Sequence, residues 1–268
     1  MRVTVLASGS AGNATLVTAG GTRILVDAGI APGTVEARMR AVFGQTLALD
    51  GIVLTHPHGD HASKAEACAR HFDVPIYLTE PTRRSLGLGR GVRTRVYGPR
   101  GPFDVQAIRV EPMAIPHDAP QVALVLAHHG LRAGIVTDLG HVPRGLAAHL
   151  SGCQLLLLES NHDPAQLWAS DYPTFLKQRI ASPRGHLSNA QAGELLRRLD
   201  RETVEVVLVH LSRTCNQRGL ALELAGRALR HRAGVVAADQ DEPLDRPVRP
   251  RGVPFRRRPH EAQLLLPL

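Results

Sequence analysis

The segment LTHPHGDH, residues 54–61, places three histidines and an aspartate within six positions at the end of an apolar run. Neutral imidazole is the side chain that most often binds metal ions in proteins. A loop at a strand end has a fixed backbone, so His56 and His58 can converge from one side, while Asp60 and His61 begin the next helix and can face a second ion. Because four buried polar groups without partners would be costly, this loop predicts four ligands for two cations.

Three further polar residues extend this pattern, because each of them follows an apolar run. His117 lies in MAIPHDA, Asp138 in GIVTDLG and His210 in VVLVHLS. Strand ends on one edge of a sheet bring their loops together, so we expect these side chains to join the histidine loop. Each residue alone would fit a structural role, but together with HPHGDH they favour a metal centre.

The composition is that of an ordinary globular protein. The chain has 268 residues, of which 43% are hydrophobic and 21% are charged, so one large domain is expected. No apolar run approaches the ~20 residues needed to cross a bilayer, and the first apolar stretch is too short for a signal peptide. We therefore expect a cytoplasmic protein without membrane contact. The widely spaced Cys68, Cys153 and Cys215 predict neither a disulfide framework nor a thiolate metal site.

The positive charge comes almost wholly from arginine. The net charge is +8, and Lys64 and Lys177 are the only lysines. This balance suits a partner rich in phosphate, although a GC-rich genome and a basic tail would explain it equally well. The arginine-rich segment 83–95 could guide a nucleic-acid backbone. An aromatic content of 3% disfavours base stacking and favours recognition of that backbone.

The hydrophobic pattern predicts an α/β (α+β) fold, an αββα sandwich of two packed sheets with helices outside. Strands are expected at 3–7, 14–18, 23–27, 51–54, 75–78, 92–97, 104–110, 121–128, 131–136, 153–160 and 204–209. Helices are expected around 32–42, 61–71, 143–150, 173–181, 188–200 and 216–232. Residues 1–235 then form one catalytic domain. Residues 236–268 are rich in Pro and Arg and poor in apolar residues, which predicts a flexible tail that is either solvated or in contact with nucleic acid.

The order HxHxDH, His, Asp, His resembles the metallo-β-lactamase superfold, over about residues 1–235. The resemblance implies two divalent ions, Zn²⁺ or Mn²⁺, with Fe²⁺ also compatible. It assigns the metal ligands as follows: His56, His58 and His117 to the first ion, Asp60, His61 and His210 to the second, and Asp138 to both. Asp27 of ILVDAG matches the structural aspartate that supports the metal loop in this superfold.

Three further segments resemble the YycJ/WalJ-type branch, which is thought to include DNA exonucleases linked to mismatch repair. They are SGSAGN (8–13), LESNHDP (158–164) and LKQRIASPRGHLSN (176–189). In tRNase Z, a related phosphodiesterase, a GHS-type histidine and a strand-end glutamate lie near the leaving group. His186 and Glu159 occupy similar positions, and such a pair would suit general-acid catalysis. The alternatives are a capping or surface role for His186 and a structural role for Glu159.

Other residues of these motifs are candidates for substrate binding. SGSAGN either brings backbone N–H groups, Ser10 and Asn13 close to a phosphate, or forms a tight turn that requires glycine. His162 in ESNHD either lines the cleft or orders its loop.

These motifs predict a metal-dependent phosphodiesterase, most consistent with a DNA exonuclease that has a role in DNA repair. Asp60, Glu159 and His186 are its expected catalytic residues, and two ions would lower the pKa of the attacking water. The alternatives are a hydrolase of a small ester, lactone, thioester or cyclic phosphodiester, and a metal-binding partner without catalytic activity. The sequence shows no long inserted cap domain between the metal motifs, which favours DNA or small substrates over RNA.

Overall fold

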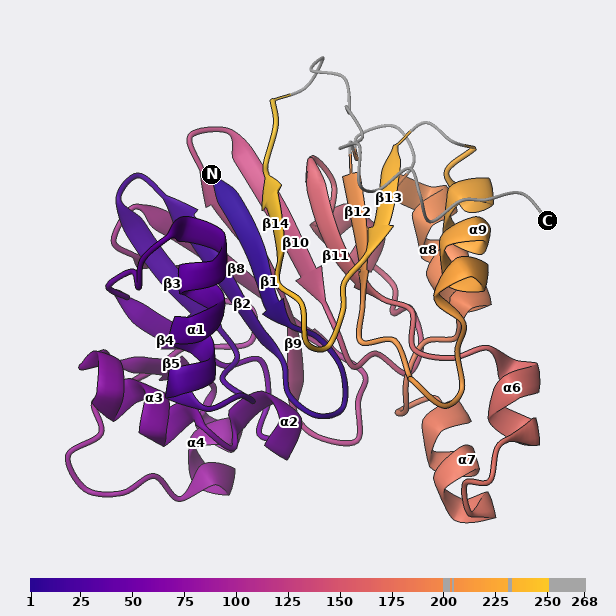
Figure 1. Cartoon of the computed structure of the whole chain (residues 1–268), viewed down its shortest axis with the longest axis horizontal. Coiled ribbons are helices and arrows are strands. Elements are labelled where there is room, and N and C mark those ends of the chain that lie inside the picture. Colours follow the sequence, from indigo (N-terminus) through magenta and orange to yellow (C-terminus); the bar gives the residue numbers. More distant parts are fainter. Residues whose placement is uncertain (200–202, 204, 231–232, 251–268) are drawn as a thin grey trace.

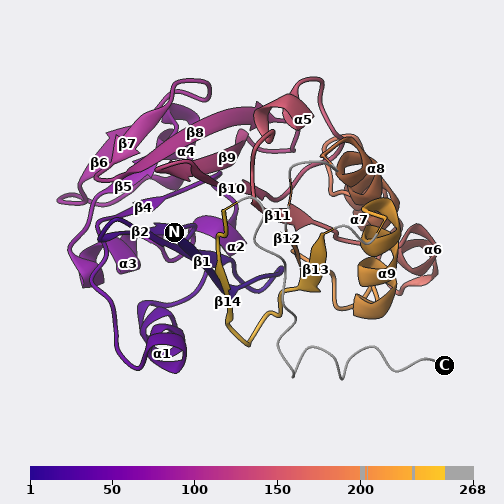
Figure 2. The same ribbon diagram turned by 90° about the horizontal axis from the view of Figure 1, so that it is seen from above.

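Two mixed seven-stranded sheets pack face to face, and helices lie against the outer face of each (Figures 1 and 2). The computed structural model describes residues 1–199, 203, 205–230 and 233–250. Figure 2 shows α1 (Pro32–Phe43) and α3 (Ala65–Phe72) on the side of the first sheet. It shows α8 (Asn189–Leu199) and α9 (Arg218–Ala228) on the side of the second. The expected αββα sandwich is therefore confirmed.

The first sheet is antiparallel at one end and parallel at the other, with its mixed strand β3 in the middle. Its order is β14 (Leu244–Pro247), β1 (Arg2–Ala7), β2 (Ala14–Ala19), β3 (Thr22–Val26), β4 (Gly51–Val53), β5 (Ile76–Leu78) and β6 (Thr94–Val96). Strands β3 to β6 are parallel, so their carboxyl ends meet at one edge.

The second sheet repeats this design. Its order is β13 (Gly234–Ala237), β12 (Glu205–Val209), β11 (Leu155–Glu159), β10 (Leu131–Val136), β9 (Gln121–His128), β8 (Ile108–Ile115) and β7 (Phe103–Val105). Strands β13 to β10 are parallel and β10 to β7 are antiparallel. The predicted strand 104–110 is in fact split between β7 and β8, because a turn at Gln106, with φ of 49°, reverses the chain.

Three apolar clusters pack against the faces of the two sheets. Successive side chains along a strand point to opposite faces, so a strand that is buried on both faces contributes to two of these clusters. Val5, Ile24 and Leu124 belong to the cluster between the sheets. Leu6 and Leu25, which point the other way, pack in the cluster under α1 and α3. A third cluster joins the outer face of the second sheet to α8 and α9. Strands buried on both faces explain why their sequences read as continuous apolar runs.

The remaining helices are short and lie in the connections. They are α2 (Gly59–Ala62), α4 (Glu80–Leu86), α5 (Leu146–His149), α6 (Pro164–Ala169) and α7 (Thr174–Ala181). The single helix expected at 61–71 is divided by a turn at 63–64 into α2 and α3. Helices α4 and α6 were not predicted. Helices α6 and α7 project together from the lower end of the molecule in Figure 1.

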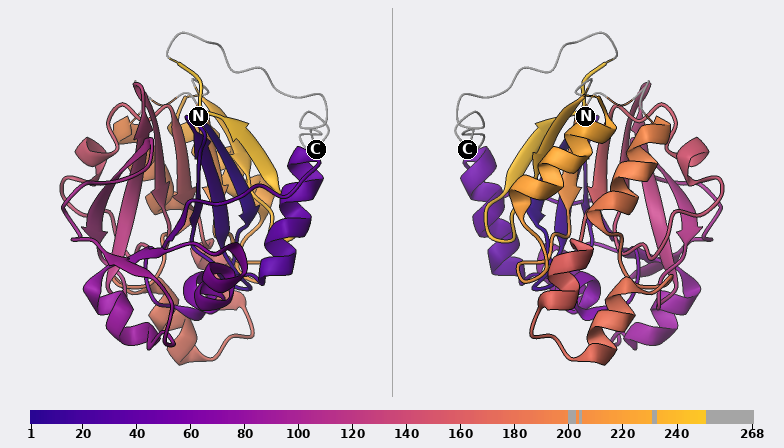
Figure 3. Two further views of the ribbon diagram at one scale, coloured as in Figure 1. Left: turned by 90° about the vertical axis from the view of Figure 1, so that its left-hand side faces the viewer. Right: turned by 90° about the vertical axis from the view of Figure 1, so that its right-hand side faces the viewer.

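The predicted start of the tail at residue 236 is wrong. The boundary falls inside β13, and β14 pairs antiparallel with β1, beside the N-terminus (Figure 3). Composition misled here because an edge strand joins a sheet through backbone hydrogen bonds, and its charged side chains can be paired. Arg246 lies 2.8 Å from Glu205 of β12, and both side chains are buried. Residues 251–268 of the expected tail lie outside the described residues.

Candidate metal centre

The predicted site residues lie where strands of both sheets end. Asp27 follows β3, the histidine loop follows β4, Glu159 ends β11, and His210 follows β12. Asp27, Asp138 and His210 have left-handed backbones, with φ of 60°, 56° and 56°. Such conformations are costly for residues other than glycine and often mark functional sites. The chain therefore turns sharply at three strand ends that surround one point.

The first group of possible ligands is His56, His58 and His117, whose ligand atoms lie within 4.8 Å of one another. Oxygen atoms lie against the outer nitrogens of two of these rings. His117 Nδ1 donates to the Gly185 carbonyl at 3.2 Å, which selects its tautomer, and His58 Nε2 lies 3.2 Å from Asp118 Oδ1. The other nitrogen of His117, Nε2, therefore carries a lone pair, and it lies 3.1 Å from His58 Nδ1.

His56 completes this first group in the same way. Thr55 Oγ1 lies 2.9 Å from Asp27 Oδ2, to which its hydroxyl donates, so it accepts from His56 Nδ1 at 3.0 Å. His56 Nε2 is buried and has no hydrogen-bond partner among the described residues. A buried polar atom without a partner is costly. Converging lone pairs and an unpaired nitrogen are what a cation would satisfy, so the first group fits a metal ion.

The second group is Asp60, His61, Asp138 and His210, again with ligand atoms within 4.8 Å. His61 Nδ1 donates to Asp27 Oδ2 at 2.7 Å, which leaves Nε2 facing Asp138 Oδ2 at 3.0 Å. His210 Nδ1 donates to Glu159 Oε1 at 3.0 Å, and its Nε2 lies 3.3 Å from Asp60 Oδ2. Two imidazoles and two carboxylates suit divalent ions such as Zn²⁺ or Mn²⁺. All seven expected metal ligands thus fall into these two groups.

The charges of the second group explain why its histidines hold protons when no metal competes. Burial opposes protonation, but Asp138 and Glu159 raise the pKa of His210 to about 10. Asp138 and Asp27 likewise raise the pKa of His61 well above its usual value, against burial. Metal binding requires these nitrogens to be free, so it must release protons.

Asp27 supports the loop from beneath. It accepts hydrogen bonds from Thr55 N at 2.8 Å and from Thr55 Oγ1, and a third from His61 Nδ1. The same carboxylate therefore fixes the orientation of His61 directly and that of His56 through Thr55. Gly29, two residues later, lets the loop approach, since a Cβ there would lie 1.8 Å from the Asp60 carbonyl oxygen. Sequence reasoning missed Thr55 and Gly29, and only the adjacent LTH and DAG segments hinted at them.

Glu159 links His210 of the second group to His186. It is fully buried, and its Oε1 lies 2.8 Å from His186 Nδ1 and accepts from His210 as well. Its Oε2 accepts from Leu139 N at 2.9 Å and Leu187 N at 3.0 Å. Burial raises the pKa of Glu159, but His186 and His210 outweigh it and hold that pKa at about 2. In turn Glu159 raises the pKa of His186 against the effect of burial, so an imidazolium ion is favoured there.

Asp118 and Arg179 are functional candidates that sequence reasoning missed. Asp118 Oδ1 lies 3.2 Å from His58 Nε2 and 3.2 Å from His117 Nε2, and its Oδ2 accepts from Arg179 Nε on α7 at 2.6 Å. Burial raises the pKa of Asp118, but Arg179, His117 and His58 together lower it below its usual value, so the carboxylate stays charged. Carboxylates behind metal-binding histidines fix the ring orientation and increase its basicity. The HDA segment placed Asp118 beside His117, but nothing in the sequence indicated its contact with α7.

The three expected substrate-binding residues are placed differently from one another. Asn13 is buried, and its Nδ2 donates to the Gly9 carbonyl at 3.1 Å and lies 2.9 Å from His61 Nε2. Gly9 and Gly12 have φ of 141° and 151°, so SGSAGN is the tight turn that requires glycine. Ser10 is exposed at its tip. His162 is buried, which lowers its pKa to about 4, and its Nδ1 has no hydrogen-bond partner among the described residues.

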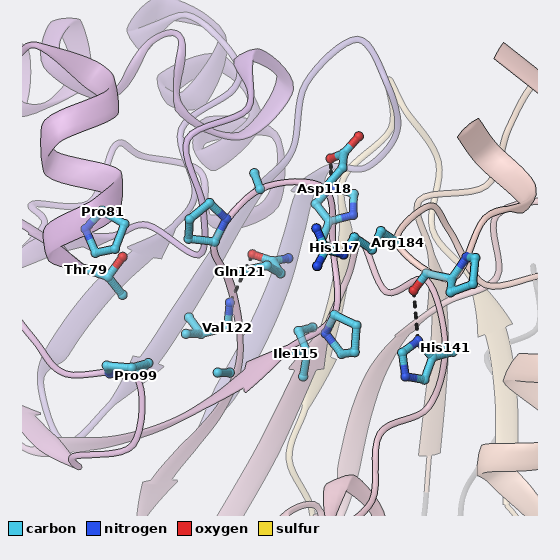
Figure 4. Close-up of a pocket in the computed structure, with 15 residues that line it drawn as sticks. Thr79, Pro81, Pro99, Ile115, His117, Asp118, Gln121, Val122, His141 and Arg184 are labelled. Carbon is cyan, nitrogen blue, oxygen red and sulfur yellow. Dashed lines mark hydrogen bonds and ion pairs between the residues drawn. The ribbon is translucent and has the colours of Figure 1, made fainter. Parts of the chain in front are cut away.

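A cavity of about 720 Å³ opens beside the first group, and His117 and Asp118 form part of its wall (Figure 4). Its walls come from the start of α4, the ends of β8 and β9, the loop between these strands, and the loop that carries Pro183 and Arg184. The candidate metal centre thus borders a space large enough for a small molecule.

Comparison with known proteins identifies the family. A beta-lactamase superfamily domain matches residues 22–211, and the chain belongs to the metallo-β-lactamase superfamily. The chain is 32% identical over 227 residues to the exodeoxyribonuclease YycJ of Bacillus anthracis, covering 82% of this chain and 86% of that protein. It is 30% identical over 229 residues to the exodeoxyribonuclease WalJ of Streptococcus pneumoniae, covering 82% and 85%. The expected resemblance to the YycJ/WalJ-type branch is therefore confirmed.

A solved structure supports the same fold. YhfI of Bacillus subtilis, a metallo-beta-lactamase fold protein, superposes with a TM-score of 0.71 at 18% identity, over 91% of this chain and 98% of that one. Fold and site together define a metallo-β-lactamase family hydrolase with a His/Asp metal site. Among the residues that the structure describes, no helix has the length and apolar character needed to span a membrane.

Proposed function

We propose that this protein is a di-metal phosphodiesterase that acts on DNA as an exonuclease. The observation that carries this proposal is the Glu159–His186 pair, which adjoins the second metal group through His210. It supplies a proton donor beside a site built for divalent ions, as cleavage of a phosphodiester requires. The two relatives named exodeoxyribonucleases support DNA as the substrate.

Different residues of the chain would take different roles in the reaction. Bound divalent ions would supply an activated water and would neutralise charge on the phosphate. Glu159 accepts from His186 Nδ1, which leaves His186 Nε2–H to protonate the leaving oxygen. Asp27 and Thr55 hold His61 and His56 in the tautomers that binding requires, and the Asp118 carboxylate lies against His58.

The choice of metal and the biological role are parts of the same proposal. Histidine and aspartate ligands suit Zn²⁺ and Mn²⁺, and we propose one of these as the resident metal. A role in DNA repair is proposed from the resemblance of the motifs to the YycJ/WalJ-type branch.

The distribution of arginines gives weaker support than the sequence suggested. In segment 83–95, Arg83 and Arg84 pair with Glu80, and Arg93 pairs with Asp73, so part of the positive charge is offset locally. The net charge of +8 still favours a polyanionic partner. Contacts between this positively charged protein and a DNA backbone should weaken as the salt concentration increases.

Substrate choice is tested by incubating the protein with 5′-labelled linear duplex DNA, single-stranded DNA, RNA and a chromogenic phosphodiester, each with Mn²⁺ or Zn²⁺. We expect metal-dependent release of nucleotides from DNA, absent in His58→Ala. Turnover of the chromogenic ester without digestion of DNA would overturn the proposal. It would favour the small-ester alternative, which the adjoining cavity would accommodate.

A further inference from the structure

The cavity beside His117 has walls that are mainly apolar and unusually rich in proline. Five of its 15 lining residues are prolines: Pro81, Pro99, Pro116, Pro120 and Pro183. Ile115 and Val122 also line it (Figure 4). Rigid rings and branched side chains offer flat apolar contact area. Such walls favour a flat ligand with apolar faces and disfavour a ligand that is charged throughout.

Most polar groups inside the cavity are already engaged with the protein. Gln121 donates to the Thr137 carbonyl at 2.8 Å and accepts from Val122 N at 3.2 Å. The Thr79 hydroxyl bonds with that of Thr82 at 3.0 Å, and His141 Nδ1 donates to the Pro183 carbonyl at 2.8 Å. The walls therefore offer few free hydrogen-bond donors or acceptors that could recognise the polar edge of a ligand. A ligand held here is recognised by shape and apolar contact.

Charged groups lie only at the end of the cavity that borders the metal centre. Arg184 is exposed there, and the charge of Asp118 is offset by Arg179 at 2.6 Å. An anionic group that enters beside Arg184 reaches the wall formed by His117, one of the first group of ligands. The ligand that fits has one flat apolar part and one phosphate, which is the chemistry of a nucleotide.

We propose that this cavity binds one unpaired nucleobase at the end of the DNA while the adjoining phosphate lies at the metal centre; this inference rests on the proposed function. A volume of about 720 Å³ matches small-molecule sites of roughly 300–1,000 Å³, so the cavity has room for one base. A base that enters it must leave its stack, which is easiest at a frayed end. Contact through proline faces, without edge readout, makes the binding independent of sequence.

This mode of binding differs from stacking on aromatic side chains. The exposed aromatic residues Trp168 and Phe175 lie on α6 and α7 and do not line the cavity. The base is instead held by prolines and aliphatic groups. The low aromatic content had disfavoured stacking as a means of holding a base. The cavity supplies apolar contact to the base without aromatic residues.

Two esters with the same leaving group isolate the contribution of the nucleoside. Thymidine 5′-(p-nitrophenyl phosphate) and methyl p-nitrophenyl phosphate both release p-nitrophenolate when water adds to phosphorus, and only the first carries a deoxyribose and a base. Because the apolar walls remove part of the base from water, we expect kcat/KM of the protein to be about tenfold or more higher for the thymidine ester. The variant Ala114→Trp fills the cavity from an exposed position on its wall, so the ratio should fall to about one.

Ala114→Ser is the matched control, because it keeps the position small, and it should retain the ratio. Activity on the methyl ester should be unchanged in both variants. An unaltered ratio in Ala114→Trp would overturn the inference, and so would an equal loss on both esters, which would show that Ala114 supports the metal centre instead.

Binding without catalysis separates this inference from the proposed function. DNA ending in 2-aminopurine is titrated with protein in the presence of a chelator, and the fluorescence of the terminal base is followed. A rise as the base leaves its stack, lost in Ala114→Trp and retained in Ala114→Ser, would support the cavity as its site. The same rise in Ala114→Trp would refute it. Failure of the wild type to cleave any DNA would sink the proposed function, whatever this titration shows.

Discussion

At the scale of single residues, hydrogen-bond acceptors behind the histidines decide which nitrogens face the metal groups. Thr55 accepts from His56, the Gly185 carbonyl accepts from His117, and the Asp118 carboxylate lies 3.2 Å from His58 Nε2. The sequence could predict the histidines because their spacing is distinctive. It could not predict most of these acceptors, since Gly185, for example, lies 68 positions from the ring it serves. Such partners become visible only when the fold brings distant segments together.

Replacing Asp118 by alanine removes the carboxylate that contacts His58. Because carboxylates behind ligating histidines contribute about 10–100-fold to metal affinity, we expect the affinity for the ion of the first group to fall by about tenfold or more. Competition with a chromophoric chelator measures this directly. Asp104→Ala on β7, which removes an exposed carboxylate paired with Arg109, is the matched control and should leave affinity unchanged. Equal affinities in the two variants would contradict the role given to Asp118.

The proton donor is tested by His186→Gln. Loss of a general acid costs about 10²–10⁴-fold in rate when the leaving group is a poor one, such as a nucleoside oxygen. A p-nitrophenolate leaving group needs no proton, so its rate should fall far less. His129→Gln, at an exposed histidine in the β9–β10 turn, controls for the substitution itself. If both substrates slowed equally, His186 would not be the acid.

At the scale of elements, the strands that carry the site were the most predictable part. Strands β9 and β10 fall at the predicted residues, and β1 to β4 lie within one or two residues of the predicted ends, because buried strands give strong apolar runs. Helices α4 and α6 were missed because they are short and have too few turns for a periodic pattern. Both begin with a proline and a side-chain cap, at Thr79 and Asp163, which was the available signal.

The contact between Gly29 and the metal loop makes a sharp test at this scale. In Gly29→Ala the new Cβ would lie 1.8 Å from the Asp60 carbonyl, so backbone must move. We expect a fall of about 1–3 kcal/mol in the free energy of unfolding, together with weaker metal binding. Chemical denaturation and metal titration measure the two effects. In Gly33→Ala, on α1, a Cβ meets nothing within 4 Å, so neither quantity should fall.

At the scale of the whole molecule, the two sheets and their outer helices were predictable, but the end of the domain was not. Alternation of strands and helices indicates the sandwich, whereas β14 has a polar sequence that resembles a linker. Its place depends on pairing with β1, which lies more than 200 residues away along the chain, and on the buried pair of Arg246 with Glu205. Long-range pairing of this kind leaves little local signature.

The packing of the whole molecule predicts that its cysteines are protected. Cys68, Cys153 and Cys215 form no disulfide bonds, and all three are buried. Burial also raises the pKa of Cys68 to about 12, which suppresses the reactive thiolate. A thiol reagent should therefore modify the native protein very slowly and all three cysteines after unfolding in denaturant. Rapid reaction of the native protein would show that the packing leaves at least one cysteine accessible to solvent.

The most direct test of the di-metal nuclease is to titrate the chelator-treated protein with Mn²⁺ or Zn²⁺. Bound metal is measured by elemental analysis, and nucleotide release from 5′-labelled duplex DNA is followed in the same samples. We predict no release from the metal-free protein, a maximum near two ions per chain, and no release at any metal concentration by His58→Ala. Full release without metal, or undiminished release by His58→Ala, would contradict the assignment of the His56–His58–His117 group to the reaction.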